Sequence, residues 1–485
     1  MKLKNSQILH KVIFILSFLS FSFFVYILFK NNIASSMYRN IAIAGLGLIY
    51  IIFAFVIFYK KISKFAKILV AILAFLLGLA LAFASYYANK SIETIKELNE
   101  NTKTEVVEFS YIVKKDSNIE SLEDLKGKDI YTALERDKEN VEKFVEKQEN
   151  TYKFVDGGDY SSISSKLLAN EVEVILLNES YRQIIEESIK NFSDSTRIVS
   201  KHDIEKVVEI KVETDKEGNP QEENKEKSQN YEGFNLYISG IDSYGSLSSF
   251  GRSDVNIILS INPKTKQILM TTIPRDSYVP IAGMGNNQKD KLTHAGIYGI
   301  NTSIESLENL FGINIDYYAK TNFSSLIKIV DALDGVDVYS SQNFSAGGYS
   351  FQKGMNHLYG NSALAFARER KSLGDGDLDR GRNQLSIIEA ILRKMMSPSI
   401  LLRYDKILEV VTNSSQTDMP YDKMMELING QISDGGEWEI KQMSLKGQGT
   451  TGLPSYAMPG WKLYMYEPYE DSINDISEKI KNTIR

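Results

Sequence analysis

Two polar segments of the chain gather arginines and carboxylates at short spacing. One runs from Asp242 to Asp276, and the other runs from Arg368 to Gln384. Arginine is permanently charged, and its planar guanidinium matches phosphate oxygens two at a time. Carboxylates among the arginines can neutralise them, or they can hold a divalent metal that also contacts the phosphate. Two such segments in one region predict a site for a phosphate or pyrophosphate group.

The first segment carries its candidate residues at the ends of expected strands. Asp242 follows an apolar run at 234–240, and Asp254 opens the next run at 255–261. Open α/β sheets bind ligands at strand ends, so the two carboxylates can meet if these strands are neighbours. Carboxylates beside arginines, without histidine or cysteine, suit Mg²⁺ or Mn²⁺ rather than zinc. Taken singly, each aspartate is better explained as a helix cap or a turn former.

Arginines supply the positive charge of both segments. Arg252 and Arg275 belong to the first segment, and Arg275 must pair with an acid or an anion because arginine is rarely a core residue. In the second segment, Arg368 and Arg370 would point the same way from an extended chain. A network of salt bridges is the structural alternative. Five arginines with matching acids, divided between two distant segments, favour an anion site.

The second segment also predicts the start of a helix. Arg380 and Gln384 are four residues apart and would share one helix face. Asp377 lies just before this helix and could cap it or hold a metal. Either Asp254 or Asp377 could accept the proton of an attacking hydroxyl, and the spacing does not choose between them.

Strands alternating with helices surround these segments and predict an α/β/α layered domain. A tight turn at 262–265 joins two of the strands, so we expect a mixed sheet. The expected strands are 234–240, 255–261, 267–273, 317–320 and 336–339, and the expected helices are 302–311, 323–333 and 385–396, the last continuing from Arg380.

Three apolar stretches without charges open the 485-residue chain. Each is about long enough to cross the roughly 30 Å hydrocarbon layer as a helix. Lysines crowd the N-terminus and the second short loop, and the positive-inside rule places both in the cytoplasm and everything after about residue 90 outside. The expected membrane spans are 12–29, 41–59 and 68–88.

The rest of the chain divides by composition. Residues 91–210 alternate helical and strand-like patterns and predict an α/β accessory domain, with a short helix at 121–128 and a buried strand at 171–177. We interpret it as a helper or spacer domain. Residues 211–230 are too polar to pack a core and predict a linker. A membrane region at 1–90 and a catalytic domain at 231–485 complete the predicted organisation.

Composition excludes several chemistries. The absence of cysteine removes thiolate nucleophiles, thiolate zinc sites and disulfides. The four histidines show no metalloprotease spacing, and no P-loop or dinucleotide fingerprint is present. A net charge of −6 without a basic tract argues against nucleic acid as a partner. Phosphoryl chemistry remains, in which arginines and a metal spread the charge on a transferring phosphate.

The order of the motifs resembles the LytR-CpsA-Psr family over about residues 231–400. The motifs that carry the resemblance are Asp242, Arg252-Ser253-Asp254, Ile273-Pro274-Arg275-Asp276, Lys291-Leu292-Thr293-His294-Ala295, Arg368-Glu369-Arg370, and Asp377 with Arg380 and Gln384. Three spans followed by an accessory domain resemble the capsule-associated members. The resemblance implies a membrane-bound ligase on the outer face of a Gram-positive cell. Such a ligase takes capsular polysaccharide from an undecaprenyl pyrophosphate carrier and joins it to peptidoglycan through a phosphodiester bond.

The resemblance also implies roles for individual residues. Asp242 and Asp254 match the metal-binding acids, which would hold Mg²⁺ or Mn²⁺, and Asp377 matches an active-site acid. The residues expected to bind pyrophosphate are Arg252, Arg275, Lys291, Arg368, Arg370, Arg380 and Gln384, and those expected to be catalytic are Arg252, Asp254, Arg275 and Asp377. Other capsule-assembly proteins are further candidate partners.

Three alternative functions stay open. One is a transcriptional regulator that acts through the short cytoplasmic parts, although lysines beside spans more often set topology or meet anionic lipid. Another is a module that holds the lipid-linked polymer without reacting. The aspartate pair argues against it, because negative charge without a metal repels a phosphate. The last is a pyrophosphatase that uses water in the same site.

Overall fold

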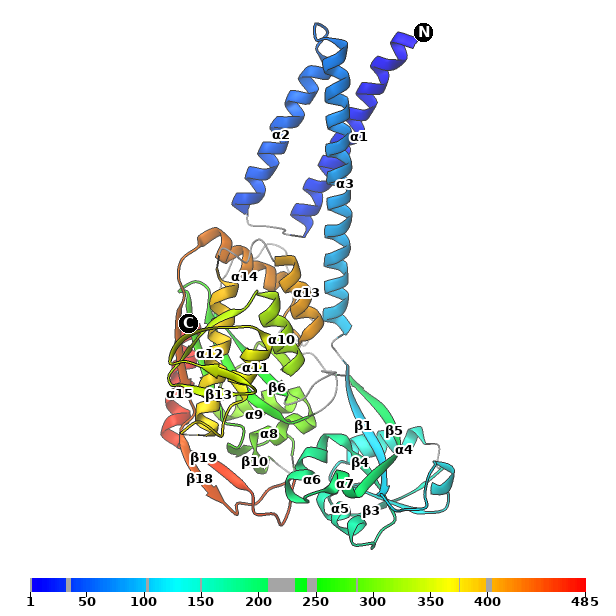
Figure 1. The fold of residues 1–485 in the computed structure, drawn as a ribbon, viewed down its shortest axis with the longest axis vertical. Helices are drawn as coiled ribbons and strands as arrows, with labels where there is room; N and C mark the ends of the chain where they lie inside the picture. Colours follow the sequence, from blue (N-terminus) through cyan, green and yellow to red (C-terminus); the bar gives the residue numbers. More distant parts are fainter. Residues whose placement is uncertain are drawn as a thin grey trace, which may run out of the picture. The chain divides into compact units, whose positions relative to one another are not determined.

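The protein was analysed as a computed structural model, shown in Figure 1. It describes residues 2–31, 36–101, 104–148, 151–207, 232–241, 251–284, 287–374, 376–397 and 404–485. The chain forms two compact units. One contains residues 1–100 and 419–437, and the other contains residues 101–418 and 438–485.

The first unit is helical. Its helices are α1 (Lys2–Lys30), α2 (Ser36–Phe58), α3 (Lys64–Asn101) and α14 (Tyr421–Asp434). The first three are each long and apolar enough to cross a membrane, over Ile8–Lys30, Tyr38–Phe58 and Lys64–Lys90. The three predicted spans are therefore confirmed as helices, each a few residues longer than expected at one end or both. Most of their large apolar side chains point outward, which suits lipid and would not suit water.

Small and polar side chains hold the apolar helices together. Ser17 on α1 donates a hydrogen bond to the carbonyl of Ala74 on α3 at 2.6 Å, and its hydroxyl lies 2.7 Å from that of Tyr50 on α2. A Cβ on Gly78 would lie 2.7 Å from the Ser17 hydroxyl oxygen, so glycine is needed for this close approach. Helices in lipid pack by such small-residue contacts because burial from water no longer drives them together.

The second unit contains a small five-stranded sheet in the order β3-β2-β4-β1-β5. Strand β1 is antiparallel to β4 and β5, whereas β2 is parallel to β3 and β4. The strands are β1 (Thr104–Lys114), β2 (Asp129–Thr132), β3 (Lys153–Asp156), β4 (Val174–Asn178) and β5 (Thr196–Val207). The helices are η1 (Glu123–Leu125), α4 (Lys138–Lys147), α5 (Tyr160–Leu168), η2 (Glu179–Tyr181), α6 (Arg182–Ser188) and α7 (Phe192–Ser195).

A larger, mixed sheet occupies the rest of the second unit, in the order β16-β11-β6-β7-β8-β17. Its central strands β6, β7 and β8 are antiparallel, and β11 and β17 run parallel to their neighbours β6 and β8. The strands are β6 (Phe234–Ile241), β7 (Ser253–Asn262), β8 (Gln267–Thr272), β11 (Tyr317–Asn322), β16 (Gln416–Thr417) and β17 (Glu439–Ser444). The predicted mixed sheet and its hairpin are confirmed, and Asn262 forms the turn by accepting backbone hydrogen bonds from Lys264 and Thr265 at 3.1 Å each.

Helices cover both faces of the larger sheet. On one face, α9 (Ile300–Phe311) and α15 (Glu470–Ile484) bury Leu307 and Ile476 against Leu269 of β8. On the other face lies α12 (Asp377–Met395), where a Cβ on Gly381 would lie 3.7 Å from the Thr272 hydroxyl oxygen. Leu269 and Thr272 are three residues apart on one strand and so point to opposite faces. The predicted α/β/α layering is confirmed.

Helices and hairpins complete the layer on the α12 side. There, α10 and α11 contact each other, and the hydrophobic cluster of α12 also includes Val336, Phe351 and Phe366. These elements are α10 (Phe323–Ala332), α11 (Gly360–Arg368), α13 (Tyr404–Ser414), β12 (Val336–Ser340), β13 (Phe344–Ala346), β14 (Tyr349–Phe351) and β15 (Gly354–Leu358). The remaining elements are β9 (Tyr278–Pro280), β10 (Lys289–Lys291), α8 (Leu292–Ala295), η3 (Gly296–Tyr298), β18 (Gly447–Thr451) and β19 (Tyr464–Pro468).

One condition was not met, and one local expectation was wrong. The segment that holds Arg368 is not the extended chain from which Arg368 and Arg370 would point the same way, because α11 continues through Arg368 and Glu369 is the first extended residue after it. The Ser362 hydroxyl accepts a hydrogen bond from the Tyr359 backbone at 3.0 Å and starts this helix. The predicted helix at 121–128 is a single 3-10 turn, η1, preceded by backbone hydrogen bonds to the Asp124 carboxylate from Glu120 at 3.0 Å and Ser121 at 2.9 Å.

Asp418 makes the stability of the second unit depend on pH. Its carboxylate accepts a hydrogen bond from the Tyr318 backbone at 2.7 Å. Burial raises the pKa of Asp418 to about 6. Backbone hydrogen bonds to the carboxylate lower the pKa, and the nearby charge of Asp316 raises it further. The folded protein therefore binds more protons than the unfolded chain between about pH 4 and pH 6. We expect its free energy of unfolding to fall by up to about 2–3 kcal/mol across that interval as pH rises.

The substitution Asp418→Asn should remove most of this pH dependence. The measurement is the melting temperature of the full chain in detergent at several values between pH 4 and pH 7. The melting temperature of the wild-type protein should fall by a few degrees relative to the variant as pH rises. Asp475→Asn, on an exposed ion pair with Lys479, is the matched control. Parallel curves for the wild-type protein and Asp418→Asn would contradict the assignment.

Candidate functional site

The candidate site lies where β6 ends and β7 begins. These strands are neighbours, and Ile241 at the end of β6 pairs with Ser253 at the start of β7. Arg252 immediately precedes β7, and Asp254 is its second residue. Asp242, the other predicted metal-binding acid, lies outside the described residues.

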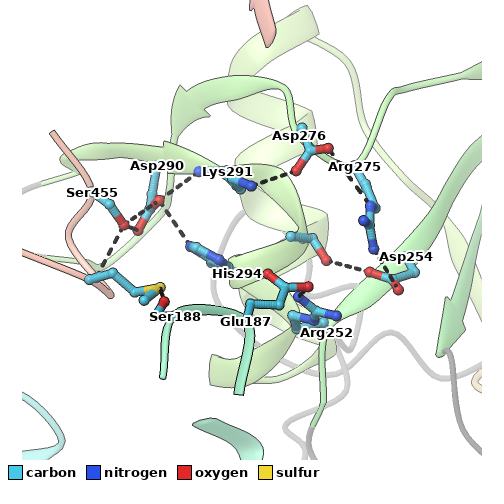
Figure 2. Close-up of polar contacts among 12 residues, drawn as sticks. Glu187, Ser188, Arg252, Asp254, Arg275, Asp276, Asp290, Lys291, His294 and Ser455 are labelled. Carbon is cyan, nitrogen blue, oxygen red and sulfur yellow. Dashed lines mark hydrogen bonds and ion pairs between the residues drawn. The ribbon is translucent and has the colours of Figure 1, made fainter. Parts of the chain in front are cut away.

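Asp254 lies at the right-hand side of the cluster shown in Figure 2. Its carboxylate accepts a hydrogen bond from Arg275 Nη1 at 3.0 Å and another from the Thr293 hydroxyl at 2.9 Å. The side chain of Asp254 is buried, and that of Arg275 is nearly so. The structure therefore brings the predicted residues of β7 and of the segment after β8 into direct contact.

A row of alternating charges extends from Asp254. Arg275 Nε lies 3.8 Å from a carboxylate oxygen of Asp276, and Lys291 Nζ lies 2.8 Å from the other. Backbone hydrogen bonds hold the two segments together, from Thr293 to the Arg275 carbonyl at 2.9 Å and from Leu292 to the Ser277 carbonyl at 2.8 Å. The predicted residue Lys291 thus lies in the same cluster as Arg275 and Asp254.

A glycine sets the position of the backbone that carries Arg252. Gly296, in η3, lies so close to this strand entry that an added Cβ would be 2.5 Å from the Gly251 carbonyl oxygen and 2.7 Å from the Ser253 nitrogen. Any larger residue would push residues 251–253 away. The close approach of backbone to backbone therefore fixes where the Arg252 side chain begins.

Asp254 is an ionised carboxylate. Burial alone would raise its pKa, but the charges of Arg252 and Arg275, the hydrogen bond from Thr293 and the charge of Arg380 hold the pKa below its ordinary value. A carboxylate with a lowered pKa is a weak proton acceptor. Asp254 is therefore better suited to orienting the neighbouring arginines by its charge, or to binding a metal, than to acting as a general base.

The second polar segment is only partly joined to this cluster. Arg380, in the first turn of α12, is close enough for its charge to lower the pKa of Asp254. Gln384 follows one turn later on the same helix. Arg368 stacks on the ring of Phe323 at 4.1 Å, and both Arg368 and Arg370 are exposed. No described contact joins Arg368, Arg370 or Gln384 to Asp254, and the side chain of Asp377 lies outside what the structure describes.

Sequence reasoning missed several residues of the site. Thr293 was noticed only within a motif, and a hydroxyl that fixes a buried carboxylate has no sequence signature of its own. Glu187, on α6, forms an ion pair with Arg252 at 2.5 Å. Asp290, fully buried, accepts hydrogen bonds from His294 Nδ1 and the Ser455 hydroxyl, both at 2.9 Å. The pairs Glu187–Arg252 and Asp290–Ser455 join residues so far apart along the chain that they leave no local pattern.

Metal binding by these residues is chemically reasonable. Asp254 offers an ionised oxygen ligand of the kind that Mg²⁺ prefers, and each of its oxygens has a lone pair beyond the one used by Arg275 or Thr293. Among the described residues, no group of three or more histidines or carboxylates is arranged to hold a metal. Asp254 is thus the described half of the predicted pair.

Comparison with known proteins places this cluster in a family. The LytR_cpsA_psr family model matches residues 197–482, more than half of the chain. The chain belongs to the LytR_cpsA_psr family. It is an α/β member of this family with three apolar N-terminal helices that suit membrane anchoring. The match begins within β5 and therefore leaves most of the small sheet, and Glu187 on α6, outside it.

Two relatives found by sequence support this assignment. This chain is 32% identical over 256 residues to a polyisoprenyl-teichoic acid–peptidoglycan teichoic acid transferase TagU of Bacillus licheniformis. The alignment covers 53% of this chain and 79% of the relative. The corresponding protein of Bacillus subtilis is 33% identical over 252 residues, covering 52% and 78%. The crystal structure of B. subtilis TagU aligns with a TM-score of 0.42 and 31% identity, covering 52% of this chain and 97% of that one.

A second model, of a DNA polymerase processivity factor, matches residues 63–177. This range begins in front of the apolar helix α3 and ends inside β4 of the small sheet. It joins parts of two separate compact units and covers neither. We draw no function from it.

Proposed function

We propose that this membrane-anchored LytR_cpsA_psr protein is a glycopolymer phosphotransferase. It would take capsular polysaccharide from an undecaprenyl pyrophosphate carrier and join it to peptidoglycan through a phosphodiester bond. The observation that carries the proposal is the cluster of positive side chains around two neighbouring carboxylates. Arg275 contacts Asp254, the charge of Arg252 acts on Asp254, and Lys291 pairs with Asp276. The cluster lies within the residues matched by the family, whose relatives are named as teichoic acid transferases.

The proposed reaction exchanges one phosphorus–oxygen bond for another. An acceptor hydroxyl of peptidoglycan attacks the phosphorus that carries the polymer, and the bond from that phosphorus to the bridging oxygen breaks. Undecaprenyl phosphate leaves, and the hydroxyl proton passes to a base, for which Asp377 is the remaining candidate. Arg252, Arg275 and Lys291 would bind the pyrophosphate oxygens and stabilise the negative charge that shifts to the bridging oxygen. The predicted roles of Arg368, Arg370, Arg380 and Gln384 in this binding stay part of the proposal.

A divalent cation is the proposed cofactor. Mg²⁺ or Mn²⁺ held by Asp254 and Asp242 would neutralise pyrophosphate charge when bound. The lowered pKa of Asp254 supports this, because it keeps the carboxylate charged and able to bind a cation. Water in place of the acceptor hydroxyl would give hydrolysis, so we include a pyrophosphatase side reaction in the proposal.

The location of the site follows from the proposed orientation. Lysines of the N-terminus and of the second loop would stay in the cytoplasm, and the large second unit would lie outside the cell, where peptidoglycan is found. The chain contains no cysteine, so one introduced at exposed Glu470 gives a clean test. A membrane-impermeant maleimide should label it on intact cells, and labelling only after lysis would reverse the orientation.

A reconstituted reaction tests the activity. The full chain in nanodiscs would be incubated with a polyprenyl pyrophosphate-linked saccharide and a peptidoglycan oligomer, with Mg²⁺ or with EDTA, and the products examined by mass spectrometry. We expect a joined phosphodiester product with Mg²⁺ and at least about a tenfold loss with EDTA. Binding of Mn²⁺, followed by electron paramagnetic resonance, should weaken in Asp254→Asn.

Each other outcome selects another function. Release of polyprenyl phosphate without joining would identify a pyrophosphatase. Retention of the lipid-linked saccharide without any product would identify a binding module. Loss of capsule transcripts in cells that lack this protein, together with no product from the purified protein, would identify a regulator.

A further inference from the structure

A carboxylate from outside the family-matched residues reaches the candidate site. Glu187 lies on α6, which packs beside the small sheet, and Arg252 Nη1 donates a hydrogen bond to its Oε1 atom at 2.5 Å. The two residues are 65 positions apart in the chain. Figure 2 shows the Glu187 side chain pointing at the Arg252 guanidinium, beside Asp254.

An extensive interface within the second unit holds α6 in this place. The hydroxyls of Tyr181 and Tyr298 lie 2.8 Å apart, and Arg136 donates a hydrogen bond to the Tyr456 carbonyl at 2.6 Å. Ser188, the residue after Glu187, lies 3.7 Å from the sulfur of Met458. Met458 is itself buried in a hydrophobic cluster with residues of α5 and α6. The position of Glu187 is therefore part of a built interface.

The two members of the ion pair differ in their freedom. The side chain of Arg252 is 10% exposed, whereas that of Glu187 is 47% exposed. Arg252 Nε is buried and, among the described residues, donates no hydrogen bond. A half-exposed glutamate can rotate into solvent at little cost, but the arginine cannot leave. Arg252 thus stays in place at the site, and Glu187 holds its Nη1 donor.

We propose that Glu187 is a resident competitor for the substrate's pyrophosphate at Arg252, and therefore sets the affinity of the site. This inference rests on the proposed function, in which Arg252 binds pyrophosphate. A phosphate oxygen that takes the Nη1 hydrogen bond must displace the carboxylate, because both are anions that seek the same donor. When the pyrophosphate substrate or the phosphate product departs, Glu187 returns and neutralises the guanidinium.

The exchange also couples the small sheet to the site. Binding free energies are linked reciprocally. If Glu187 lowers the affinity of the site for a ligand by some factor, the bound ligand lowers the equilibrium constant for docking of α6 at Arg252 by the same factor. Occupancy of the site by pyrophosphate should therefore loosen α6. This gives the domain that we interpreted as a spacer a role in substrate binding.

The test measures binding of inorganic pyrophosphate to the full chain in nanodiscs by isothermal titration calorimetry at a fixed Mg²⁺ concentration. We expect Glu187→Gln to bind pyrophosphate about fivefold more tightly than the wild-type protein. The neutral amide competes less well than the carboxylate for Arg252 at this partly exposed ion pair. Glu186→Gln is the matched control. It removes the same charge from the same helix, but the Glu186 carboxylate accepts a hydrogen bond from Ser193 instead. The control should bind as the wild-type protein does.

Hydrogen exchange supplies a second readout. Saturating pyrophosphate should increase exchange of the backbone amides of α6 in the wild-type protein and leave it unchanged in Glu187→Gln. Equal or weaker pyrophosphate binding by Glu187→Gln, with wild-type binding that is lost in Arg252→Ala, would overturn this inference and leave the proposed function standing. Wild-type binding that is unaffected by Arg252→Ala, or no binding by any variant, would overturn both.

Discussion

Replacing Arg275 by alanine should lower the rate of polymer transfer by about a hundred- to a thousandfold, the range found when one preorganised donor to a transition-state charge is removed. Arg275 contacts Asp254 and lies beside Asp276, so it is the described residue that joins both acids of the cluster. Its loss would remove charge from the phosphate-binding face and leave Asp254 with fewer partners. The measurement is the single-turnover rate of the reconstituted reaction.

Two further variants separate chemistry from folding. Arg275→Lys keeps a positive charge near Asp254 but loses the planar fork, and we expect at least about a tenfold loss of rate with little change in melting temperature. Arg393→Ala removes an arginine from an exposed ion pair with Glu389 on α12 and should leave the rate unchanged. A normal rate in Arg275→Ala that remains folded would exclude Arg275 from the reaction.

The strands and spans could be predicted because their signals are local. Alternating or continuous apolar residues define β6, β7 and β8, and the turn at Asn262 follows from side-chain chemistry within four residues. The three apolar helices have a length and composition that only lipid or a large core could cover. Arg252 and Asp254 stand at the start of β7, and the pairing of β6 with β7 places the end of β6 beside them.

The missing parts of the site depend on contacts between distant segments. Glu186 and Glu187 are identical neighbours on α6, and only the docking of that helix decides which of them meets Arg252. Thr293 reaches Asp254 because two backbone hydrogen bonds tie its helix to the segment after β8. Periodicity describes which face of an element is buried and gives no information about which other element covers it.

Arg368 illustrates an argument whose condition was not met. Two arginines two residues apart would point the same way if their segment were extended. The structure instead continues α11 to Arg368, and the signal for that helix was present in Ser362, three residues after Tyr359. A helix-start signal is therefore a better guide to the conformation at Arg368 than the spacing of the two arginines.

Asp290→Ala should destabilise the second unit by more than about 3 kcal/mol, because it removes a fully buried acceptor from several donors at once. Its carboxylate accepts hydrogen bonds from the Lys291 backbone at 2.7 Å, the Ala457 backbone at 2.8 Å, His294 at 2.9 Å and the Ser455 hydroxyl at 2.9 Å. Burial alone would raise the pKa of Asp290, but His294 and the backbone hydrogen bonds hold it below the ordinary value, so the acceptor is ionised.

The effect should appear as a fall of the melting temperature of the full chain by on the order of 5–10 °C. The chain contains its own control, because Asp337 and His357 form the same kind of pair at 2.7 Å on the surface. Asp337→Ala should cost less than about 1 kcal/mol, since water replaces the lost partner. Equal destabilisation by both substitutions would show that burial does not decide the value of the Asp290 cluster.

Loss of Asp290 should also act on the site at a distance. The carboxylate fixes the segment at Ser455 and Ala457, and the next residue, Met458, packs against Ser188 beside Glu187. Loosening this segment would weaken the hold on α6 and release Arg252 from Glu187. Asp290→Ala should therefore raise pyrophosphate affinity at temperatures where it remains folded. Unchanged affinity in a clearly destabilised variant would show that the other contacts of this interface hold α6 without the Asp290 segment.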